Sequence, residues 1–439
     1  MQKVAAYRLE HNITDDDARS AEIDEIIGLL RKWLVEKRAD DPSANEGEFR
    51  SERDDSSGRF EWQQSEYERR SWRMLRLSEE LAQGRQFETS ISVTDTGRSV
   101  VVYTTLASGL ISSAVTPVRT EARCPRPIRG ILDLHTSWYH GTTRIQGLRR
   151  TEGHEAGRQL ADEIRSSSRT LPLIVISEDD GEQFLPKLDK KLSRSLLGLA
   201  NVTVIDEGAS WGLTDVLGKG RSCYWGAIRI YWPRYDENRH QIWRVRRLLD
   251  SGATTERFEA QIRSHVMRVS ALSAVRPKDI DQIRRGSDRA RMQHVQEQLK
   301  SREEWEAYAE MYASDNTKLL QKNERLEEEN SRLRDELQNA QALLGALPEH
   351  DEEILPDRAD EEEDPGPTKG EIRYYKKIGS SRKMDKMVET SACGHSAWQS
   401  AHKADKAKKG IERYVGRRDW KSVQHCGSCT GGGMWKVQW

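Results

Sequence analysis

The chain has 439 residues, 33% of them charged and only 35% in the hydrophobic set, with a formal net charge of −1. This length predicts several domains, and the low apolar fraction predicts that parts of the chain lack a core of their own. No apolar run approaches the roughly 20 residues of a membrane-spanning helix, and the first residues lack the apolar stretch of a signal peptide, so we expect a cytoplasmic protein with no membrane span.

The N-terminal region, residues 1–90, is predicted to be helical with a polar linker. Apolar residues recur at helical spacing in 20–39, which is typical of an amphipathic helix. A polar, turn-rich stretch follows, and residues 61–82 are predicted as a second helix. Residues 91–126 are expected to form a separate β-rich module, because β-branched residues alternate on both sides of a turn at Gly97.

Residues 127–250 hold the strongest pattern for a regular core. Two short apolar runs, 171–177 and 201–206, are typical of buried strands in a parallel sheet. Stretches with helical spacing precede, separate and follow these runs, and 226–233 is predicted as a third strand. This alternation predicts an α/β multidomain protein whose parallel-sheet α/β core is a three-layer sandwich. Its sequence contains no glycine signature of a dinucleotide or P-loop site.

Acidic residues follow both predicted core strands. Glu178 and Asp179 come directly after the first apolar run, and Asp206 and Glu207 come at the end of the second. Functional groups of open α/β sheets collect beyond the carboxyl ends of the strands, so these four residues are candidate catalytic carboxylates that can hold Mg²⁺ or Mn²⁺. A metal-dependent nuclease or phosphoesterase is therefore one functional hypothesis. The structural alternative is that such residues begin loops and cap helices.

A third stretch, residues 133–144, gathers His, Asp, Ser and Arg in a short span. His135 and His140 are five residues apart, which fits neither one helix face nor one strand face. We interpret the stretch mainly as a loop anchored by its aromatic residues. On either side of it, Cys124 and Cys223 are predicted to be free thiols, as expected in a reducing compartment.

Residues 251–347 are predicted as a helical region that ends in a long coiled-coil helix. One heptad position is occupied by Leu319, Leu326, Leu333, Ala340 and Leu347. Asparagine occupies the companion position in three successive heptads, which favours a parallel two-stranded coil and predicts self-association as a homodimer. The alternative is a single solvated helix. Residues 348–368 are acidic and are predicted as a flexible tether.

Residues 369–439 are predicted to form a small zinc-stapled α+β module, meaning that a structural Zn²⁺ ion holds its fold together. The four expected ligands lie in a C-x-H and a C-x-x-C motif: Cys393, His395, Cys426 and Cys429. Three thiolates and one imidazole make a closed tetrahedral site, which is typical of structural rather than catalytic zinc. His425 and His402 are alternatives for the fourth ligand.

The predicted elements of this module are strands at 371–377 and 434–439 and a helix at roughly 396–414. This plan resembles zinc-ribbon and treble-clef modules in its architecture. A core of this size is thin, so bound zinc is expected to contribute to its folding.

The module is also basic: residues 369–439 carry sixteen Lys or Arg and six acids. The candidate nucleic-acid-binding residues are Lys403, Lys406, Lys409, Arg413, Arg417 and Arg418. Clustered cations bind phosphates, and Trp398, Trp420 and Trp435 can either stack on unpaired bases or fill the small core. The leading hypothesis is a dimeric protein that binds DNA or RNA, or acts as a scaffold, within a larger nucleic-acid-handling complex. Besides the nuclease, the other alternative is an adaptor whose basic tail binds a protein.

Overall fold

The structure is a computed structural model, which describes residues 1–51, 56–81, 85–110, 123–135, 137–298, 306, 309–311, 313–329, 367–380, 384–401, 404–429 and 433–439. It combines helices with several β-sheets, in agreement with the mixed composition that the sequence predicts. Contacts divide the chain into two units, one of Met1–Ile283 with Glu362–Trp439 and one of Arg284–Glu361.

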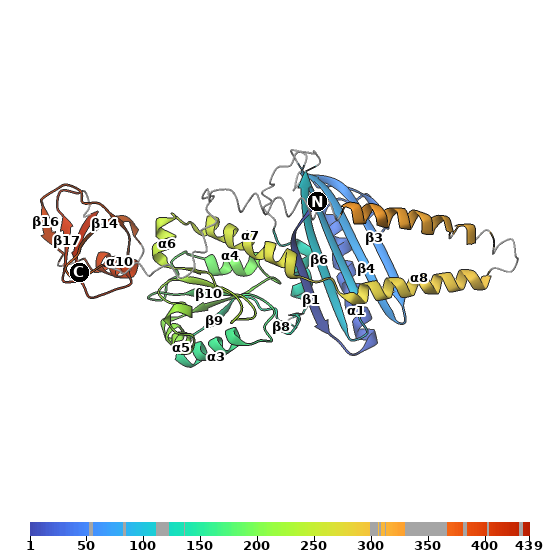
Figure 1. The fold of residues 1–439 in the computed structure, drawn as a ribbon, viewed down its shortest axis with the longest axis horizontal. Coiled ribbons are helices and arrows are strands. Elements are labelled where there is room, and N and C mark those ends of the chain that lie inside the picture. The colour runs from blue at the N-terminus through green and yellow to red at the C-terminus, as the bar shows by residue number, and fades with distance from the viewer. Residues whose placement is uncertain are drawn as a thin grey trace. The chain divides into compact units, whose positions relative to one another are not determined.

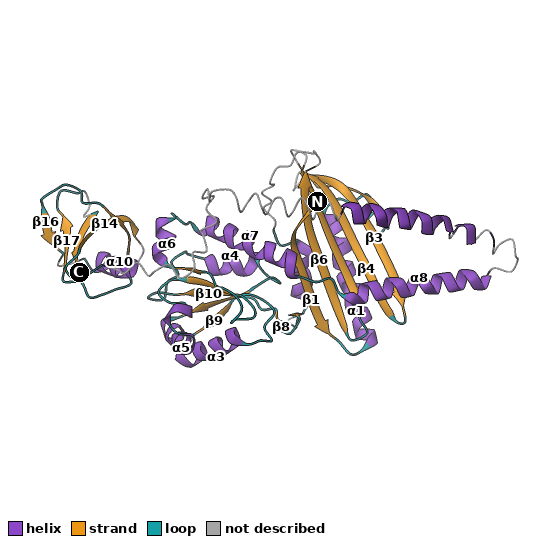
Figure 2. Cartoon of the chain, viewed as in Figure 1, coloured by secondary structure: helices purple, strands orange, loops and turns teal. Residues whose placement is uncertain are grey.

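An eight-stranded antiparallel sheet forms the N-terminal part of the first unit (Figures 1 and 2). The order of its strands is β2-β3-β4-β5-β6-β1-β7-β8, so the first strand of the chain lies inside the sheet. The strands are β1 Gln2–Asn12, β2 Glu46–Ser51, β3 Ser56–Tyr67, β4 Arg70–Leu81, β5 Arg85–Asp95, β6 Ser99–Leu110, β7 Tyr139–His140 and β8 Thr143–Arg144.

The helix predicted for residues 61–82 is wrong, because this stretch forms most of the β3–β4 hairpin. The hairpin turns at Glu68 and Arg69, whose φ values are 50° and 60°. Two-residue turns with two positive φ values are usually marked by Asn or Gly, so the sequence gives no turn signal at this point. The predicted division at residue 90 falls inside β5, and the strands on both sides of it belong to one sheet.

The amphipathic helix expected near residues 20–39 is α1, Asp16–Glu36, which packs on β5 and β6. Its N-cap is Asp15, whose carboxylate accepts a hydrogen bond from the Ala18 N–H at 2.7 Å. The next helix, α2 (Arg126–Leu134), packs against α1. The expected hairpin at Gly97 is also present, as β5–β6.

A five-stranded mixed sheet forms the core of the α/β part, in the order β13-β12-β10-β11-β9. Strands β9 (Arg149–Thr151), β10 (Leu173–Ser177) and β11 (Asn201–Ile205) are parallel, as predicted for the second and third of them. Strand β12 (Ile228–Tyr231), which lies within the predicted third strand at 226–233, is antiparallel to β10, and β13 (Ile242–Trp243) is antiparallel to β12. The prediction of a wholly parallel core sheet is therefore wrong, because the sheet is mixed.

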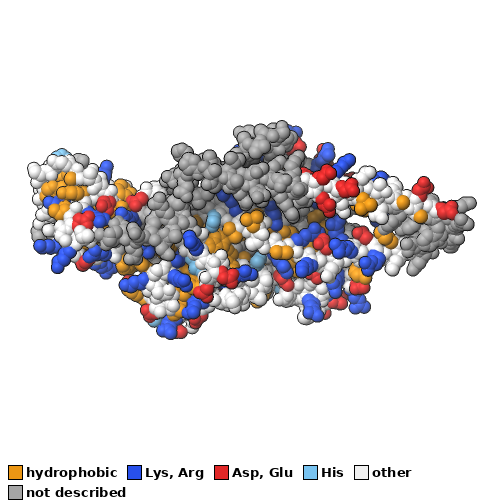
Figure 3. Space-filling view, viewed as in Figure 1, with side chains coloured by type: hydrophobic (Ala, Val, Ile, Leu, Met, Phe, Trp, Pro, Cys, Tyr) orange, Lys and Arg blue, Asp and Glu red, His pale blue; other side chains and the backbone are white. Residues whose placement is uncertain are grey.

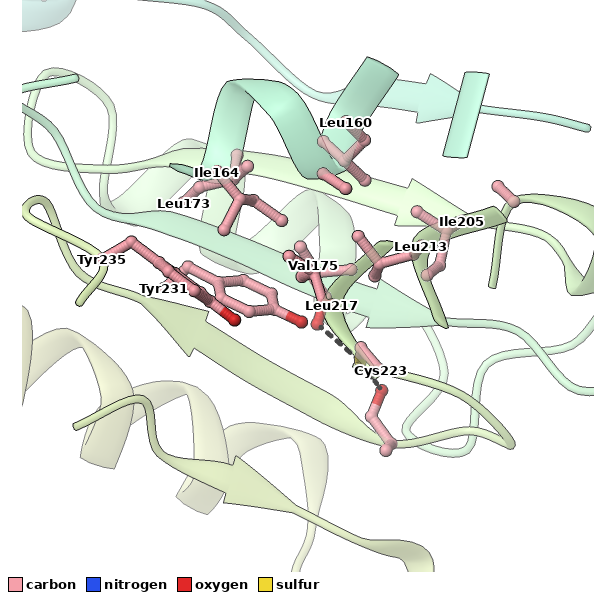
Figure 4. Close-up of a cluster of buried hydrophobic side chains, with 13 residues drawn as sticks. Leu160, Ile164, Leu173, Val175, Ile205, Leu213, Leu217, Cys223, Tyr231 and Tyr235 are labelled. Atoms are coloured by element: carbon pink, nitrogen blue, oxygen red, sulfur yellow. Dashed lines mark hydrogen bonds between the residues drawn. The ribbon is translucent and has the colours of Figure 1, made fainter. Parts of the chain in front are cut away.

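Helices lie on both faces of this sheet (Figure 1). Helices α3 (His154–Arg165) and α5 (Glu207–Leu217) cover one face, and α4 (Leu188–Ser195), α6 (Val245–Asp250) and α7 (Thr255–Ser273) lie on the other. The side chains of α3 and α5 meet those of β10, β11 and β12 in a buried, mainly apolar cluster that also contains Cys223, Tyr231 and Tyr235 (Figure 4). Gly212 lets α5 approach α3, since a Cβ there would lie 1.9 Å from the His154 carbonyl oxygen.

The C-terminal module contains a five-stranded antiparallel sheet in the order β15-β14-β18-β17-β16. Its elements are β14 Ile372–Ser380, β15 Asp385–Thr390, β16 Trp398–Ser400, α10 Asp405–Val415, β17 Ser422–Cys426 and β18 Met434–Gln438. Two of these strands match the predicted ones, and the helix begins later than predicted because 398–400 pairs with β17. Helix α10 packs on β15 through Gly410, where a Cβ would lie 2.1 Å from the Asp385 carbonyl oxygen.

The second unit is helical in its described part. Helix α8 (Lys278–Gln298) begins in the first unit and continues into the second, and residues 313–329 are also helical. The heptad residues Leu319 and Leu326 are 59% and 45% exposed on this stretch. The heptads from residue 330 onward and almost all of the predicted tether lie outside the described residues, so the coiled coil stays a prediction. No helix in the described part of the chain is both long and apolar enough to cross a membrane.

Candidate metal centre and nucleic-acid interface

Cys393, His395, Cys426 and Cys429 come together at one end of the C-terminal sheet. Their ligand atoms all lie within 4.8 Å of one another, which is close enough to hold a metal ion. The Cys429 Sγ lies 3.6 Å from the His395 Nδ1. The C-x-H motif is in the loop before β16, and the C-x-x-C motif begins at the last residue of β17. Because β16 and β17 pair, with Trp398 opposite Cys426, a bound ion would tie this hairpin to the preceding loop.

Acid–base chemistry at the cluster fits a cation site. Burial opposes ionisation of the Cys426 thiol, but hydrogen bonds from the Ser428 backbone and the Cys393 thiol outweigh burial and lower its pKa to about 7. Burial and the adjacent Cys426 and Cys393 thiols raise the pKa of Cys429 to about 11. The Cys426 thiolate therefore forms readily, and its negative charge disfavours ionisation of the Cys429 thiol. A divalent cation bound between them would offset this repulsion and allow both thiolates to form.

Of the three candidate histidines, His395 belongs to this cluster. His425 is adjacent to Cys426 in β17, so its side chain points to the opposite face of the sheet, where its ring lies 5.7 Å from that of Trp435. His402 lies outside the described residues. The arrangement agrees with the predicted set of three thiols and His395.

The face of the C-terminal sheet opposite α10 carries aromatic and basic side chains; we call it the open face. Tyr375 packs against Tyr414 of α10 with ring centroids 5.8 Å apart, so its neighbour Tyr374 points to the open face. The Tyr374 ring lies 5.6 Å from the ring of Trp398. Above the Trp398 ring, the Lys436 Nζ lies 5.9 Å from its centroid.

Strand register assigns the other residues of the open face. Tyr374 pairs with Lys436, and Lys436 pairs with Gln424, so these three side chains share one side of the sheet. Lys376, two residues after Tyr374, is on the same side and exposed. By this register, none of the described strand residues on the open face is acidic. The described strand residues of this face therefore combine flat aromatic rings with positive charge and include no carboxylate.

The predicted basic helix face instead contacts carboxylates of the α/β core. Lys409 Nζ lies 3.0 Å from an Asp180 carboxylate oxygen, and Arg413 forms an ion pair with Asp179. The Arg413 guanidinium also lies 5.3 Å above the ring of Trp225. Burial and the nearby Arg418 lower the pKa of Arg413 to about 10, so Arg413 remains charged at neutral pH and Asp179 compensates its charge.

The remaining predicted cations of the module have varied surroundings. Arg417 donates to Asp419 and to the Pro367 carbonyl oxygen, the latter at 2.6 Å. Arg418 is exposed, with its Nε 3.9 Å from Glu412. Lys406 is exposed at the start of α10, whereas Lys403 lies outside the described residues.

Among the tryptophans, Trp398 is the one on the open face. Trp435 is only 7% exposed and belongs to the small core. Trp420 donates its indole N–H to Glu412 at 2.9 Å, on the α10 side of the sheet. Of the two alternatives that the sequence left open, the core applies to Trp435, whereas the partly exposed Trp398 stays a candidate for stacking.

The predicted catalytic carboxylates lie at the strand ends but already have structural partners. Both carboxylate oxygens of Glu178 accept hydrogen bonds from Arg150, at 3.0 and 2.8 Å. Asp206 is the N-cap of α5, accepting from the Ala209 N–H at 2.7 Å. Its carboxylate also accepts from the Gly153 N–H at 3.0 Å. Capping thus accounts for Asp206, as the structural alternative predicts.

A cleft of about 260 Å³ lies where α10 meets the core, and Asp179 and Glu207 line it together with Lys409 and Arg413. In the described part of the chain, the four predicted carboxylates do not form a group of three or more with their oxygens within 4.8 Å. Catalysis at this edge stays a prediction.

The two isolated cysteines are free thiols, as predicted. Burial raises the pKa of Cys223 to about 11, which makes its thiol unreactive at neutral pH. Charges of both signs are intermixed on the face of the molecule drawn in Figure 3, so clusters matter more than the net charge.

Comparison with protein-family models, curated proteins and solved structures finds no match for this chain. Its function must therefore be argued from the geometry of its own side chains.

Sequence reasoning missed Tyr374, Lys376 and Lys436. The available signal was the alternation in EIRYYKK and MWKVQW, which places every second residue on one face of a strand. Which of the two faces α10 covers is a tertiary property, and it decides which residues are accessible to a ligand.

Proposed function

We propose that the chain binds single-stranded nucleic acid through the open face of its C-terminal sheet, and that structural zinc at the Cys393–Cys429 cluster holds this sheet in shape. The observation that carries the proposal is the Tyr374–Trp398–Lys436 arrangement, with ring centroids 5.6 Å apart and an ammonium group over the indole. Unpaired bases stack on such rings, and the lysines attract the backbone phosphates.

This proposal assigns the phosphate contacts differently from the sequence-based hypothesis. Two of the predicted cations, Lys409 and Arg413, contact Asp180 and Asp179, so their charge is compensated within the chain. Lys376 and Lys436 lie on a face that has no acidic strand residue in the described register. Nucleic acid at the open face gains their attraction without first breaking those ion pairs.

Affinity measurements on the full-length protein test the proposal. Anisotropy of labelled single-stranded oligonucleotides should give a Kd that rises about tenfold in Trp398→Ala, because one stacked base contributes roughly 1–3 kcal/mol. Trp420→Ala is the matched control, since Trp420 is on the α10 side, and its Kd should change less than twofold. Equal affinity of Trp398→Ala and the wild type would refute the assignment.

The same reactions separate the alternative functions. Cleavage of the oligonucleotide that depends on Mg²⁺ and is lost in Glu207→Ala would favour the nuclease hypothesis. Lack of binding to single-stranded and double-stranded DNA and RNA would favour the protein adaptor.

We also propose that two chains associate through the heptad helix. The exposed leucines Leu319 and Leu326 of residues 313–329 form an apolar stripe that a second copy can cover. Two tethered modules on one polymer would then bind more tightly than either alone. Light scattering after gel filtration should give a dimer for the wild type and a monomer for Leu326→Asp. A monomeric wild type would contradict the dimer.

A further inference from the structure

A second group of metal-ligating side chains lies far from the cysteines, where three N-terminal elements meet. His11 is in β1, Glu22 is in α1, and His135 directly follows α2. Their ligand atoms lie within 4.8 Å of one another. Among the described residues, this group and the cysteine cluster are the two sets of three or more potential metal ligands.

The interatomic distances are close to those of ligands that share one ion. Glu22 Oε2 lies 2.8 Å from His11 Nδ1 and 3.7 Å from His135 Nε2. Atoms bound at about 2.0–2.2 Å to one zinc ion lie roughly 3.0–3.5 Å apart, so each separation differs from that range by a few tenths of an ångström. The His11–Glu22 distance alone fits a hydrogen bond, but 3.7 Å is too long for one, so hydrogen bonding does not explain the position of His135.

Burial of the carboxylate adds a second argument. The Glu22 side chain is 4% exposed, whereas those of His11 and His135 are 17% and 37% exposed. Buried carboxylates are usually paired with a cationic group or coordinated to a metal, and a divalent cation between the three side chains would serve as such a partner. Elsewhere on these helices α2 packs closely on α1: at Gly130 of α2, a Cβ would lie 2.7 Å from Leu29 Cδ1 of α1.

A large cavity adjoins this group. It has a volume of about 700 Å³, and His135 and Trp138 line it together with the cations Arg144, Lys190 and Arg194. The three cations would favour an occupant with negative charge in this cavity.

We propose that His11, Glu22 and His135 form a second metal site, and that the adjoining cavity binds an anion carrying a phosphate or carboxylate group. Two imidazoles and one carboxylate suit zinc, manganese or iron(II), and three protein ligands leave the ion with open coordination positions. The anion would occupy one of these positions. This site is independent of the nucleic-acid face and of the zinc cluster in the C-terminal module.

Metal stoichiometry of the full-length protein tests the site. After removal of metal and reloading with Zn²⁺, mass spectrometry should find two ions per chain in the wild type and one in His135→Ala. His154→Ala is the matched control, because His154 is a half-exposed histidine outside both groups, and it should retain two ions. Cys426→Ser should also hold one ion. A wild type with a single ion, or His135→Ala with two, would overturn the proposal.

Orthophosphate is the probe for the cavity. Calorimetric titration of the zinc-loaded protein should show phosphate binding that is abolished in His135→Ala and weakened at least fivefold in Arg194→Gln. Arg158→Gln, an exposed arginine on α3, should bind as the wild type does. Circular dichroism checks that each variant is folded. We expect them all to fold, because His135 and Arg194 are both at the surface. The same phosphate affinity in all four proteins would rule out the cavity as the anion site.

Discussion

Removal of one charge from the open face should change the salt dependence of nucleic-acid binding by a calculable amount. Affinity for a single strand falls with salt with a logarithmic slope of about −0.7 for each phosphate that the protein neutralises. Lys376 and Lys436 are the lysines that the register places on this face of β14 and β18. Two contacts predict a slope of about −1.4, which corresponds to a roughly sevenfold loss of affinity between 50 and 200 mM salt.

The variant for this test is Lys436→Gln, which keeps a long polar side chain without charge. The magnitude of its slope should decrease, from about 1.4 to about 0.7. Its affinity at low salt should also decrease, because Lys436 lies 5.9 Å from the Trp398 ring centroid and is part of the same surface. Anisotropy titrations of the full-length protein at four or more salt concentrations give both quantities.

Lys409→Gln is the matched control, because Lys409 is on α10 and contacts Asp180 at 3.0 Å. Its slope should equal that of the wild type. The reasoning is refuted if Lys409→Gln reduces the magnitude of the slope and Lys436→Gln leaves it unchanged, since α10 would then be the phosphate-binding surface.

Three further predictions concern stability. Chelation of zinc should abolish the unfolding transition of the C-terminal module, because structural zinc contributes on the order of 10 kcal/mol, and a calorimetric scan unaffected by chelator would contradict this. Arg150→Gln should lower the free energy of unfolding by about 1–3 kcal/mol in denaturant titrations, because it leaves buried Glu178 without its bidentate partner. His240 should make stability fall as the pH drops from about 6.5 to 4, since burial lowers its pKa to about 4 and the unfolded chain then binds the extra proton. The loss should reach about 1–2 kcal/mol after solvent screening, and His240→Asn should flatten it; an unchanged slope in that variant would assign the effect to other groups.

The physical basis of the His240 prediction is its fixed tautomer. Its Nδ1 accepts a hydrogen bond from the Trp232 N–H at 3.2 Å, while its Nε2 lies 2.9 Å from the Tyr235 carbonyl oxygen. Protonation would place two N–H donors against each other at Nδ1.

Prediction from sequence succeeded where the signal was local. The spacing of the four ligand residues predicted their convergence, because short motifs at the ends of a hairpin are brought together by few contacts. Apolar runs predicted β10 and β11 as buried strands of a parallel sheet, and the two strands are indeed parallel. The turn at Gly97 was visible because only a few residue types adopt its positive φ without strain.

Prediction failed where long-range pairing decides the structure. Strand β1 lies between β6 and β7, and no pattern within residues 1–90 specifies a partner near residue 100. The direction of β12 depends on the path of the chain between Ile205 and Ile228, which periodicity does not reveal. His11, Glu22 and His135 come from three separate elements, so their meeting could not be read from spacing. For the same reason, ion pairs between α10 and the core were not foreseen.

Ultraviolet crosslinking of the full-length protein to a single-stranded oligonucleotide, followed by mass spectrometry of the peptides, tests the central claim most directly. Aromatic residues stacked on bases form crosslinks, so we expect nucleotide adducts on the peptides that contain Tyr374 and Trp398. Adducts confined to α10 or to the α/β core, with none on these two peptides, would contradict binding at the open face.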